Sequence, residues 1–481
     1  MLLFNLMKKI LYSTAITFSA LFMGSCGDLL DVNNDPSRVG GDAATLSTLL
    51  PSAERFTSTT QYGSAQYGAQ YPQYLAGQTI GQFSPYGFDQ LWQPFYTDAF
   101  PSLQDIINRA EEAGAYNYSG IAKTLLALNL MTVADIYGDA PYSQANQGTA
   151  NLYPCYDKME DLYRVHIINL LDEALADLAK PLPTVPSLRA VQNDLIYGGD
   201  LAKWTKAAKA IRARYFLHLS EKDPAALATA AQEAAASFGS FSEDLQLVYE
   251  QQNPNPWFGF LGNATNKPMQ PSSYIVDLMS GRGGRFQGVS DPRLPVYMTR
   301  TSATQTDVGL TPGRIVGDQT NVNVNMTPTS WHTRAVAPIQ FITYAEMQFI
   351  IAEALFNTNR AESHAAYRRG IEASMTKVGV PVAEISAYMN NPAVALTPAT
   401  LTLQDIMLQK YLALFLQIET WTDMRRYQYD QNVYPRLEKP VINQLPGNPW
   451  VQRSNLADEE PGVNTCLPTG VTQTSVLWLF Q

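Results

Sequence analysis

Aromatic and amide side chains gather in two short stretches of the sequence. The segment QFSPYGFDQLWQPFY, residues 82–96, contains Tyr86, Phe88, Gln90 and Trp92. The segment NPNPWFGF, residues 253–260, contains Asn253, Asn255, Trp257 and Phe258. A neutral oligosaccharide presents apolar C–H faces and rings of hydroxyl groups, which aromatic rings and amides bind well. We therefore take these eight residues as candidates for binding a sugar.

The sequence supports sugar binding by one tryptophan more strongly than by the other. Trp92 could equally pack as the first core residue of a helix that begins near Gln90, because large aromatic side chains are mostly buried. Trp257 stands in a proline-rich loop, and loops lie on the surface. We therefore expect Trp257 to be exposed and leave both interpretations of Trp92 open.

A glycine-rich segment, GRGGRFQG, places Arg282 and Arg285 close together. Two guanidinium groups could bind an anionic sugar or a carboxylate, so both arginines are further ligand candidates. The segment misses the phosphate-binding pattern GxGxxG because Phe286 occupies the last glycine position. A solvated loop is the simpler interpretation.

The residues that could catalyse a reaction are badly placed for one. Glu346 and Glu353 lie seven residues apart on one expected helix, hence roughly 10 Å apart along its axis. Glycosidase carboxylates lie about 5 to 9.5 Å apart and flank the substrate. Pairing with Arg425 or Arg426 is the expected role of these glutamates. A glycoside hydrolase is only a remote alternative, and we predict that the protein is not an enzyme.

The sequence offers little support for a metal site or a cofactor. It contains neither HExxH nor GxSxG. The histidines are too scattered along the chain to suggest a metal site, and they are His166, His218, His332 and His364. We therefore predict no metal and no cofactor.

The first 25 residues have the layout of a secretory signal. Lysines precede an apolar run at 10–23, and Gly24 and Ser25 stand directly before Cys26. Small residues before a cysteine resemble the lipobox of bacterial lipoproteins, in which the cysteine is lipidated and becomes the first residue. We therefore predict a lipoprotein signal peptide at 1–25 and lipidation of Cys26. A secreted protein cleaved nearby, with Cys26 free, is the alternative.

Charge and cysteine content limit the partners and the compartment. The chain has 33 Lys and Arg against 43 Asp and Glu, a net charge of −10 at pH 7. An acidic chain without a basic cluster is unsuited to nucleic acid, whose binding requires neutralised phosphates. Beyond Cys26 there are Cys155 and Cys466, which form either one disulfide or two buried thiols; the sequence does not choose.

The elements that must position these residues are mainly helices. Helical periodicity, with alanine at contact positions, predicts helices at 120–137, 156–180, 200–220, 343–356, 363–379 and 402–428. The first should end at Gly138. These segments form consecutive pairs, as in tetratricopeptide-like hairpins. We therefore expect a mainly α scaffold at about 45–238 and 341–430, and irregular loops at about 239–340 and 431–481 that carry the ligand side.

Several segments, in order along the chain, resemble the SusD/RagB family of Bacteroidetes outer-membrane nutrient-binding lipoproteins, particularly its SusD-like branch. They are CGDLLDVNNDPS from Cys26, ADIYGDAPYS from Ala134, YGGDLAKWTKAAKAIRARYFLHLS from Tyr197, SDPRLPVY from Ser290, FITYAEMQFIIAEA from Phe341, YRRGIEASM from Tyr367 and QKYLALFLQIETWTDMRR from Gln409. Together they indicate one SusD-like domain at 26–481.

The resemblance implies a fold and a role. The fold is a tetratricopeptide-like helical scaffold with a loop-rich ligand-binding side. The role is a lipid-anchored outer-membrane protein at the cell surface that captures a nutrient, expected to be an oligosaccharide or else a peptide. It would deliver the nutrient to a SusC-like TonB-dependent transporter and act as its lid. A stand-alone, adhesin-like surface protein that binds a glycan or peptide is the alternative.

Overall fold

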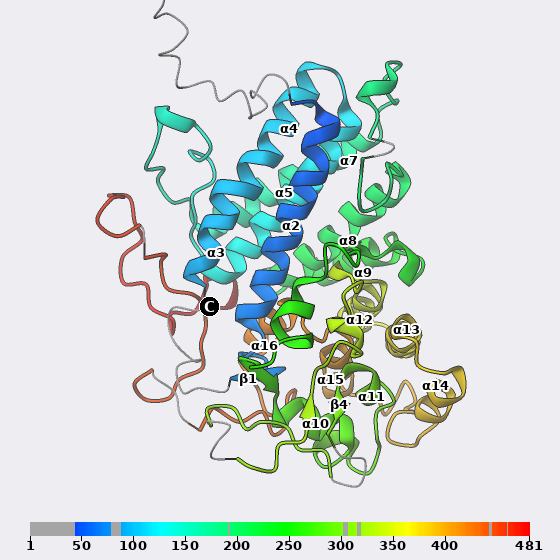
Figure 1. The fold of residues 1–481 in the computed structure, drawn as a ribbon. Coiled ribbons are helices and arrows are strands. Elements are labelled where there is room, and N and C mark those ends of the chain that lie inside the picture. The colour runs from blue at the N-terminus through cyan, green and yellow to red at the C-terminus, as the bar shows by residue number, and fades with distance from the viewer. Residues whose placement is uncertain are drawn as a thin grey trace, which may run out of the picture.

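The computed structural model describes residues 44–77, 88–190, 193–301, 306–314, 319–441, 445–458 and 460–481. Helices dominate these residues, and long irregular segments run around them (Figure 1). This confirms the predicted mainly α fold with few strands. Two predicted site residues, Cys26 and Tyr86, lie outside the described residues.

The helices follow one another along most of the chain. They are α2 (Leu46–Gly68), α3 (Asp89–Gln93), α4 (Phe100–Glu112), α5 (Tyr116–Tyr137), α6 (Met159–Asp161), α7 (Ile168–Leu178), α8 (Leu201–Leu219), α9 (Ala226–Ala235), α10 (Ser273–Ser280), α11 (Leu294–Tyr297), α12 (Tyr344–Ala354), α13 (Arg360–Val378), α14 (Val382–Met389), α15 (Leu403–Ala413) and α16 (Glu419–Arg426).

Among the described residues, short strands form three antiparallel pairs. β1 (Leu75–Gly77) pairs with β3 (Met269–Pro271), and β2 (Leu245–Leu247) pairs with β6 (Ile339–Ile342). β4 (Thr299–Arg300) pairs with β5 (Val324–Asn325). Each pair ties a loop to a distant part of the chain.

Neighbouring helices pack as hairpins, which is the predicted arrangement. The closest packing joins α4 to α5, α5 to α7, α8 to α9 and α12 to α13. Glycine permits the close approach at two of these interfaces. A Cβ on Gly120 of α5 would lie 2.7 Å from the Leu178 side chain, and one on Gly370 of α13 would lie 2.8 Å from Phe349. Both distances are below van der Waals contact, so a larger residue would separate the helices.

The helix α5 is the centre of the N-terminal part of the scaffold. Among the described residues it is the one helix that is long and apolar enough to cross a membrane. Every residue of its most apolar window is buried inside the protein, as expected of a core helix that is apolar on all sides. It ends at Gly138, as predicted, where φ is +78° and a side chain would clash with Leu477.

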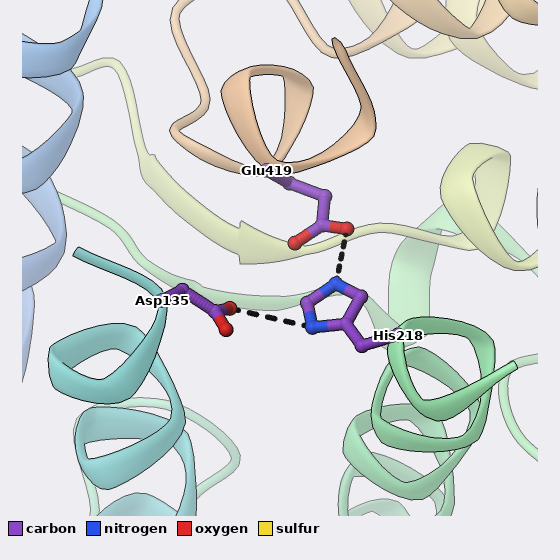
Figure 2. A group of neighbouring side chains, drawn as sticks. All are labelled: Asp135, His218 and Glu419. Carbon is purple, nitrogen blue, oxygen red and sulfur yellow. Dashed lines mark hydrogen bonds and ion pairs between the residues drawn. The ribbon is translucent and has the colours of Figure 1, made fainter. Parts of the chain in front are cut away.

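A network of charged side chains occupies the interior where α5, α8, α12 and α16 meet. Arg214 Nε lies 2.7 Å from Glu346 Oε1 and 3.3 Å from Glu419 Oε2. His218 Nε2 lies 2.7 Å from Glu419 Oε1, and its Nδ1 lies 3.3 Å from Asp135 Oδ2 (Figure 2). All five side chains are buried. The imidazole therefore bridges two carboxylates that come from different helices.

The network continues between α12, α15 and α16. Lys410 Nζ lies 2.8 Å from Asp423 Oδ2 and 3.3 Å from Glu353 Oε2. Arg426 pairs with both of these carboxylates. Glu353 therefore pairs with Arg426, as predicted. Glu346 also pairs with an arginine, as predicted, but the partner is Arg214 of α8 rather than Arg425 or Arg426, because α12 packs against that helix.

The protonation of this network follows from its geometry. Burial alone would lower the pKa of His218, but Glu419 and Asp135 outweigh it and raise the pKa to about 9. Burial alone would raise the pKa of Glu419, but His218 and Arg214 lower it to about 2. At neutral pH, His218 is therefore an imidazolium held between two carboxylates.

Replacing this histidine tests the pH dependence that the network confers. Since the folded pKa of His218, about 9, exceeds the ordinary value of 6.5, its stabilisation is complete below the ordinary value and is lost as pH rises through the folded value. We expect the stability deficit of His218→Gln to shrink by up to about 3 kcal/mol between about pH 6 and about pH 10. Urea unfolding across this range measures the deficit.

The control for this experiment is His364→Gln. The His364 ring nitrogen lies 2.6 Å from the Leu396 carbonyl oxygen rather than between carboxylates. A deficit of His218→Gln that stays constant with pH would contradict the imidazolium assignment.

Candidate ligand-binding site

A cavity of about 780 Å³ opens between α3, α4 and two loops. Its volume is within the range of about 300 to 1,000 Å³ that is common for ligand sites. The first loop spans 141–154 and the second brings Glu460 to the rim. The residues lining this cavity, which we call the α3–α4 cavity, are Trp92, Tyr96, Thr97, Pro101, Gln104, Asp105, Asn108, Pro141, Ala145, Asn146, Gln147, Gly148, Thr149, Asn151, Leu152, Pro154 and Glu460.

A distorted helical turn places Tyr96 in the cavity wall. Residues Pro94–Ala99 form a π-helical segment between α3 and α4, in which the backbone N–H of Phe100 donates to the Phe95 carbonyl oxygen five residues back. Pro94 and Pro101 lack an N–H, so a regular α-helical ladder is incomplete here. The Tyr96 hydroxyl donates to the Pro141 carbonyl oxygen at 2.8 Å, which joins this turn to the 141–154 loop.

Trp92 stands between the protein core and the cavity. Its side chain is 6% exposed, and its ring lies 4.4 Å from that of Tyr96 and 5.9 Å from that of Tyr156, measured between centroids. It also contacts the Tyr137 ring edge-on at 5.0 Å. The interpretation of Trp92 as a core residue is therefore confirmed. The residue also lines the cavity, and its contact with a ligand stays a prediction.

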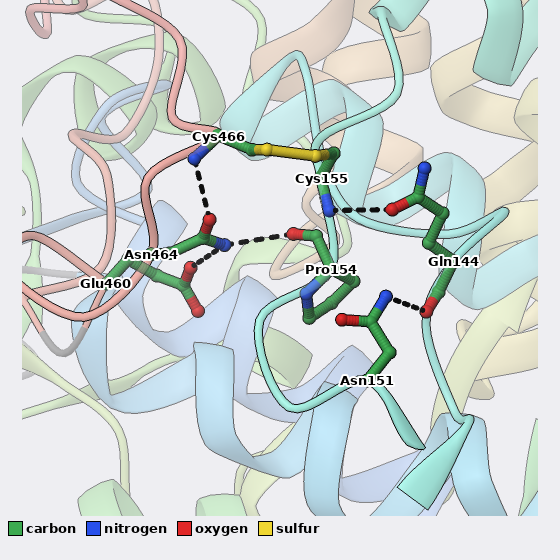
Figure 3. The surroundings of a disulfide bond; sticks show 7 residues. All are labelled: Gln144, Asn151, Pro154, Cys155, Glu460, Asn464 and Cys466. Carbon is green, nitrogen blue, oxygen red and sulfur yellow. Dashed lines mark hydrogen bonds between the residues drawn. A yellow bond between two sulfur atoms is a disulfide. The ribbon is translucent and has the colours of Figure 1, made fainter. Parts of the chain in front are cut away.

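A disulfide between Cys155 and Cys466 fixes the two loops to each other (Figure 3). Beside it, Asn464 Nδ2 donates to the Pro154 carbonyl oxygen at 2.9 Å and to Glu460 Oε2 at 3.0 Å. Glu460 Oε1 in turn accepts a hydrogen bond from Trp92 Nε1 at 3.3 Å. The sequence left open whether these cysteines form a disulfide or stay as thiols, and the structure contains the disulfide. The bond links the two loops that form one wall of the cavity.

A single carboxylate holds the base of the 141–154 loop. Asp157 Oδ2 accepts hydrogen bonds from the backbone N–H groups of Tyr142 and Ser143, both at 2.8 Å. Polar side chains follow along this loop and on the facing helix. They are Thr97, Gln104, Asn108, Asn146, Gln147, Thr149 and Asn151. These amides and hydroxyls can hydrogen-bond the hydroxyls of a sugar whose ring stacks on the half-buried Tyr96.

The other candidates of the first aromatic segment lie elsewhere. Phe88 is 1% exposed and packs against both Tyr71 and Trp421, whose rings also stack on each other. The prediction of a ligand contact was wrong for Phe88, because the ring completes an aromatic stack in the core. Gln90 is exposed, accepts a hydrogen bond from the Tyr67 hydroxyl at 2.7 Å, and does not line the cavity.

The second aromatic segment folds inward. Asn255 is fully buried, donates to the Ala337 carbonyl oxygen at 2.9 Å, and accepts from the backbone N–H of Trp257 at 2.8 Å. Trp257 is 3% exposed and packs edge-on against Tyr62. The cavity beside it measures only about 20 Å³, room for about one water. The predicted exposure of Trp257 was wrong, because the Asn255 side chain closes the loop over the core, and Asn255 itself is structural.

The remaining two residues of this segment are nearer the surface. Asn253 is exposed, and Phe258 is half-buried at the start of a π-helical turn, Phe258–Gly262. Neither lines the α3–α4 cavity.

The two arginines of the glycine-rich loop pair within the protein. Arg285 Nε lies 2.6 Å from Asp405 Oδ1, a fully buried carboxylate at the start of α15. Arg282 pairs with Asp277 of α10. Their charges therefore fasten the loop to two helices, and neither arginine lines the α3–α4 cavity.

Sequence reasoning missed most of the cavity wall. Tyr96 lies in the aromatic segment but was not singled out, and Asn146, Asn151 and Glu460 were not considered. The signal that could have found them is the run PYSQANQGTANLYPC from Pro141 to Cys155, which is rich in small and amide residues and ends at a cysteine.

One group of side chains has the donor atoms that a metal requires. Ligand atoms of Asp135, His218 and Glu419 lie within 4.8 Å of one another. The imidazolium form of His218 holds a proton on both nitrogens, and each nitrogen faces a carboxylate. In this structure the three side chains form an ion-pair cluster.

The burial of Trp257 predicts a large loss of stability on truncation. Trp257→Ala removes a ring that packs in the core, so we expect the free energy of unfolding to fall by about 3 to 5 kcal/mol. Tyr153→Ala, at a residue that is 55% exposed, is the control and should change it by less than about 0.5 kcal/mol. Denaturant unfolding compares the two variants. Equal effects would place Trp257 at the surface.

Comparison with solved structures places this architecture among known folds. A chitin-binding protein matches 86% of this chain and 93% of its own at 23% identity, with a TM-score of 0.70. A chitin-binding SusD homologue from Flavobacterium johnsoniae matches 91% and 98% at 18% identity, with a TM-score of 0.72. A SusD/RagB family protein from Bacteroides thetaiotaomicron matches 87% and 95% at 22% identity, with a TM-score of 0.66.

Sequence comparison extends this likeness of fold to a family. A search of curated protein sequences finds no match. A sequence profile of the SusD-like family, described as "starch-binding associating with outer membrane", matches residues 37–454. Because the match spans most of the chain, the resemblance seen in the sequence is confirmed and the protein belongs to the SusD-like family.

Proposed function

We propose that the protein is a lipid-anchored lipoprotein of the cell surface that captures an oligosaccharide in the α3–α4 cavity. It passes this ligand to a SusC-like TonB-dependent transporter in the outer membrane and acts as the transporter's lid. Cys26 carries the lipid anchor. The protein binds its ligand and leaves it chemically unchanged.

The single observation that carries the proposal is the cavity of about 780 Å³ with an aromatic wall and an amide-rich loop. Tyr96, which is half-buried, offers a ring for stacking on the apolar face of a sugar, and Trp92 packs against that ring. The loop 141–154 carries several amide side chains close together in the sequence, between Gln144 and Asn151. This combination is typical of sites that bind neutral, hydroxyl-rich molecules.

Relatives support a glycan as the ligand. The family is described as starch-binding and as associated with the outer membrane. Two structural neighbours are named as chitin-binding proteins. Starch and chitin are both neutral polymers of glucose-type rings, so they share the apolar faces and hydrogen-bonding groups that this cavity suits.

The carboxylates considered for catalysis favour binding over chemistry. Glu346 and Glu353 are buried and pair with arginine or lysine. In the α3–α4 cavity, Asp105 forms an ion pair with Arg109 at 2.8 Å. A glycosidase needs two carboxyl groups that flank the scissile bond, and neither Glu346 nor Glu353 lines the α3–α4 cavity.

Closing the cavity with a bulky side chain tests the site. Thr149 is exposed on the loop and lines the cavity, so Thr149→Trp should fill the opening without disturbing the core. We expect binding of maltoheptaose or chitohexaose to weaken at least about tenfold, while the thermal midpoint stays close to wild type. Isothermal titration calorimetry and a thermal melt measure the two quantities.

The matched control is Thr59→Trp, which adds the same side chain at an exposed position of α2 away from the cavity. Its affinity should equal that of the wild type. Equal affinity of Thr149→Trp and wild type would move the ligand site away from the α3–α4 cavity.

The transport role predicts a stable partner. Protein extracted from its native membrane in mild detergent and purified by a C-terminal tag should retain a stoichiometric outer-membrane barrel, identified by mass spectrometry. The N-terminal peptide of the same sample should begin at a lipid-modified Cys26. Recovery of the protein alone, under conditions that preserve other membrane complexes, would favour the stand-alone surface binder instead.

A further inference from the structure

The charges around the α3–α4 cavity are of one sign. The charged side chains among its described lining residues are Asp105 and Glu460, and this lining contains no lysine or arginine. Of the nearby cations, Arg109 forms an ion pair with Asp105 itself. Lys158 pairs with Asp139 at 2.8 Å, and the buried Arg453 donates to the Ser454 carbonyl oxygen at 3.1 Å. Neither Lys158 nor Arg453 lines the cavity, so the charged groups on the described lining are carboxylates.

The two carboxylates differ in how well their charge is compensated. Asp105 Oδ1 lies 2.8 Å from Arg109 Nε on the same helix, so this pair is close to neutral. Glu460 accepts hydrogen bonds from Trp92 Nε1 and from the Asn464 amide, both of them uncharged donors. Among the described residues it forms no ion pair. One net negative charge therefore stands at the rim, beside the ring on which a sugar would stack.

We propose that Glu460 makes this cavity selective for the charge of the glycan: it admits neutral sugars, favours those with a free amino group, and rejects uronic-acid and sulfated sugars. This proposal rests on the proposed function of the α3–α4 cavity. The ammonium group of a sugar bound next to Trp92 would form a charge-assisted hydrogen bond with Glu460. A carboxylate or sulfate at the same place would be repelled, with no cation to offset the repulsion.

The test uses two pairs of sugars that differ in charge. The uronate pair differs only by methyl esters, whereas the amino pair differs also in its acetyl groups, so Glu460→Gln is needed to separate charge from shape. Chitohexaose is neutral, and its fully deacetylated form, glucosamine hexaose, carries ammonium groups. Methyl-esterified oligogalacturonate is neutral, and free oligogalacturonate carries carboxylates. Titration calorimetry at low salt measures each sugar with the full chain. We expect the amino-bearing hexamer to bind about tenfold tighter than chitohexaose, and the free uronate to bind at least about tenfold more weakly than its ester.

Glu460→Gln isolates the charge. Glutamine keeps an oxygen that accepts from Trp92 Nε1, so the rim geometry is retained while the charge is lost. We expect this variant to bind the charged and the neutral member of each pair within about threefold of each other. Asp458→Asn is the control, because it removes the same charge two residues away at an exposed position that does not line the cavity. It should discriminate as the wild type does.

The outcomes separate this proposal from the proposed function. If the wild type binds free oligogalacturonate as tightly as its ester, or if Glu460→Gln still discriminates, the charge selection by Glu460 is overturned while glycan binding stands. If an array of neutral, amino-bearing and acidic glycans gives no binding at all, the glycan-capture function fails, and the selection by Glu460 fails with it.

Discussion

The architecture depends on the buried ion pairs that join α8 to α12 and α16. Arg214 and His218 reach two carboxylates, Glu346 and Glu419, that lie far away along the chain. Leaving one such charge without its partner costs about 3 to 5 kcal/mol, whereas a satisfied pair adds little net stability. The main effect of the network is therefore on how these helices are arranged rather than on the free energy of unfolding. It admits one arrangement of these helices and penalises the others.

This arrangement reaches the cavity through α16. The guanidinium of Arg425 on α16 donates to the Asp135 carbonyl oxygen near the end of α5 and to the Gln452 carbonyl oxygen at 3.0 Å. The backbone N–H of Ser454 donates to the Ile136 carbonyl oxygen at 2.8 Å. The C-terminal segment is thus held at the end of α5, and it brings Glu460 to the rim. A core network and a surface cavity are joined by a few hydrogen bonds.

The sequence predicts the scaffold better than the site, for physical reasons. Helical periodicity is local, so the end of α5 at Gly138 and the pairing of helices follow from residues near one another in the chain. Whether a loop is buried, by contrast, depends on residues that lie far apart in the chain. The proline-rich sequence around Trp257 predicts an exposed loop. The Asn255 side chain, however, forms hydrogen bonds with the backbone of Trp257 and Ala337, and the Trp257 ring packs in the core. The cavity wall combines residues from 92–154 with Glu460, and no periodic pattern connects them.

The covalent link between Cys155 and Cys466 has a consequence for how the cavity comes into being. The two cysteines are 311 residues apart in sequence, so the helices α6 to α16 are synthesised between one half of the wall and the other. Bringing such distant segments together carries a large loop-closure entropy, which the intervening helices must offset first. The two halves of the cavity wall are therefore linked covalently only in a chain that is already folded and oxidised. Up to that point the second half, with Glu460, is held against the first by hydrogen bonds alone.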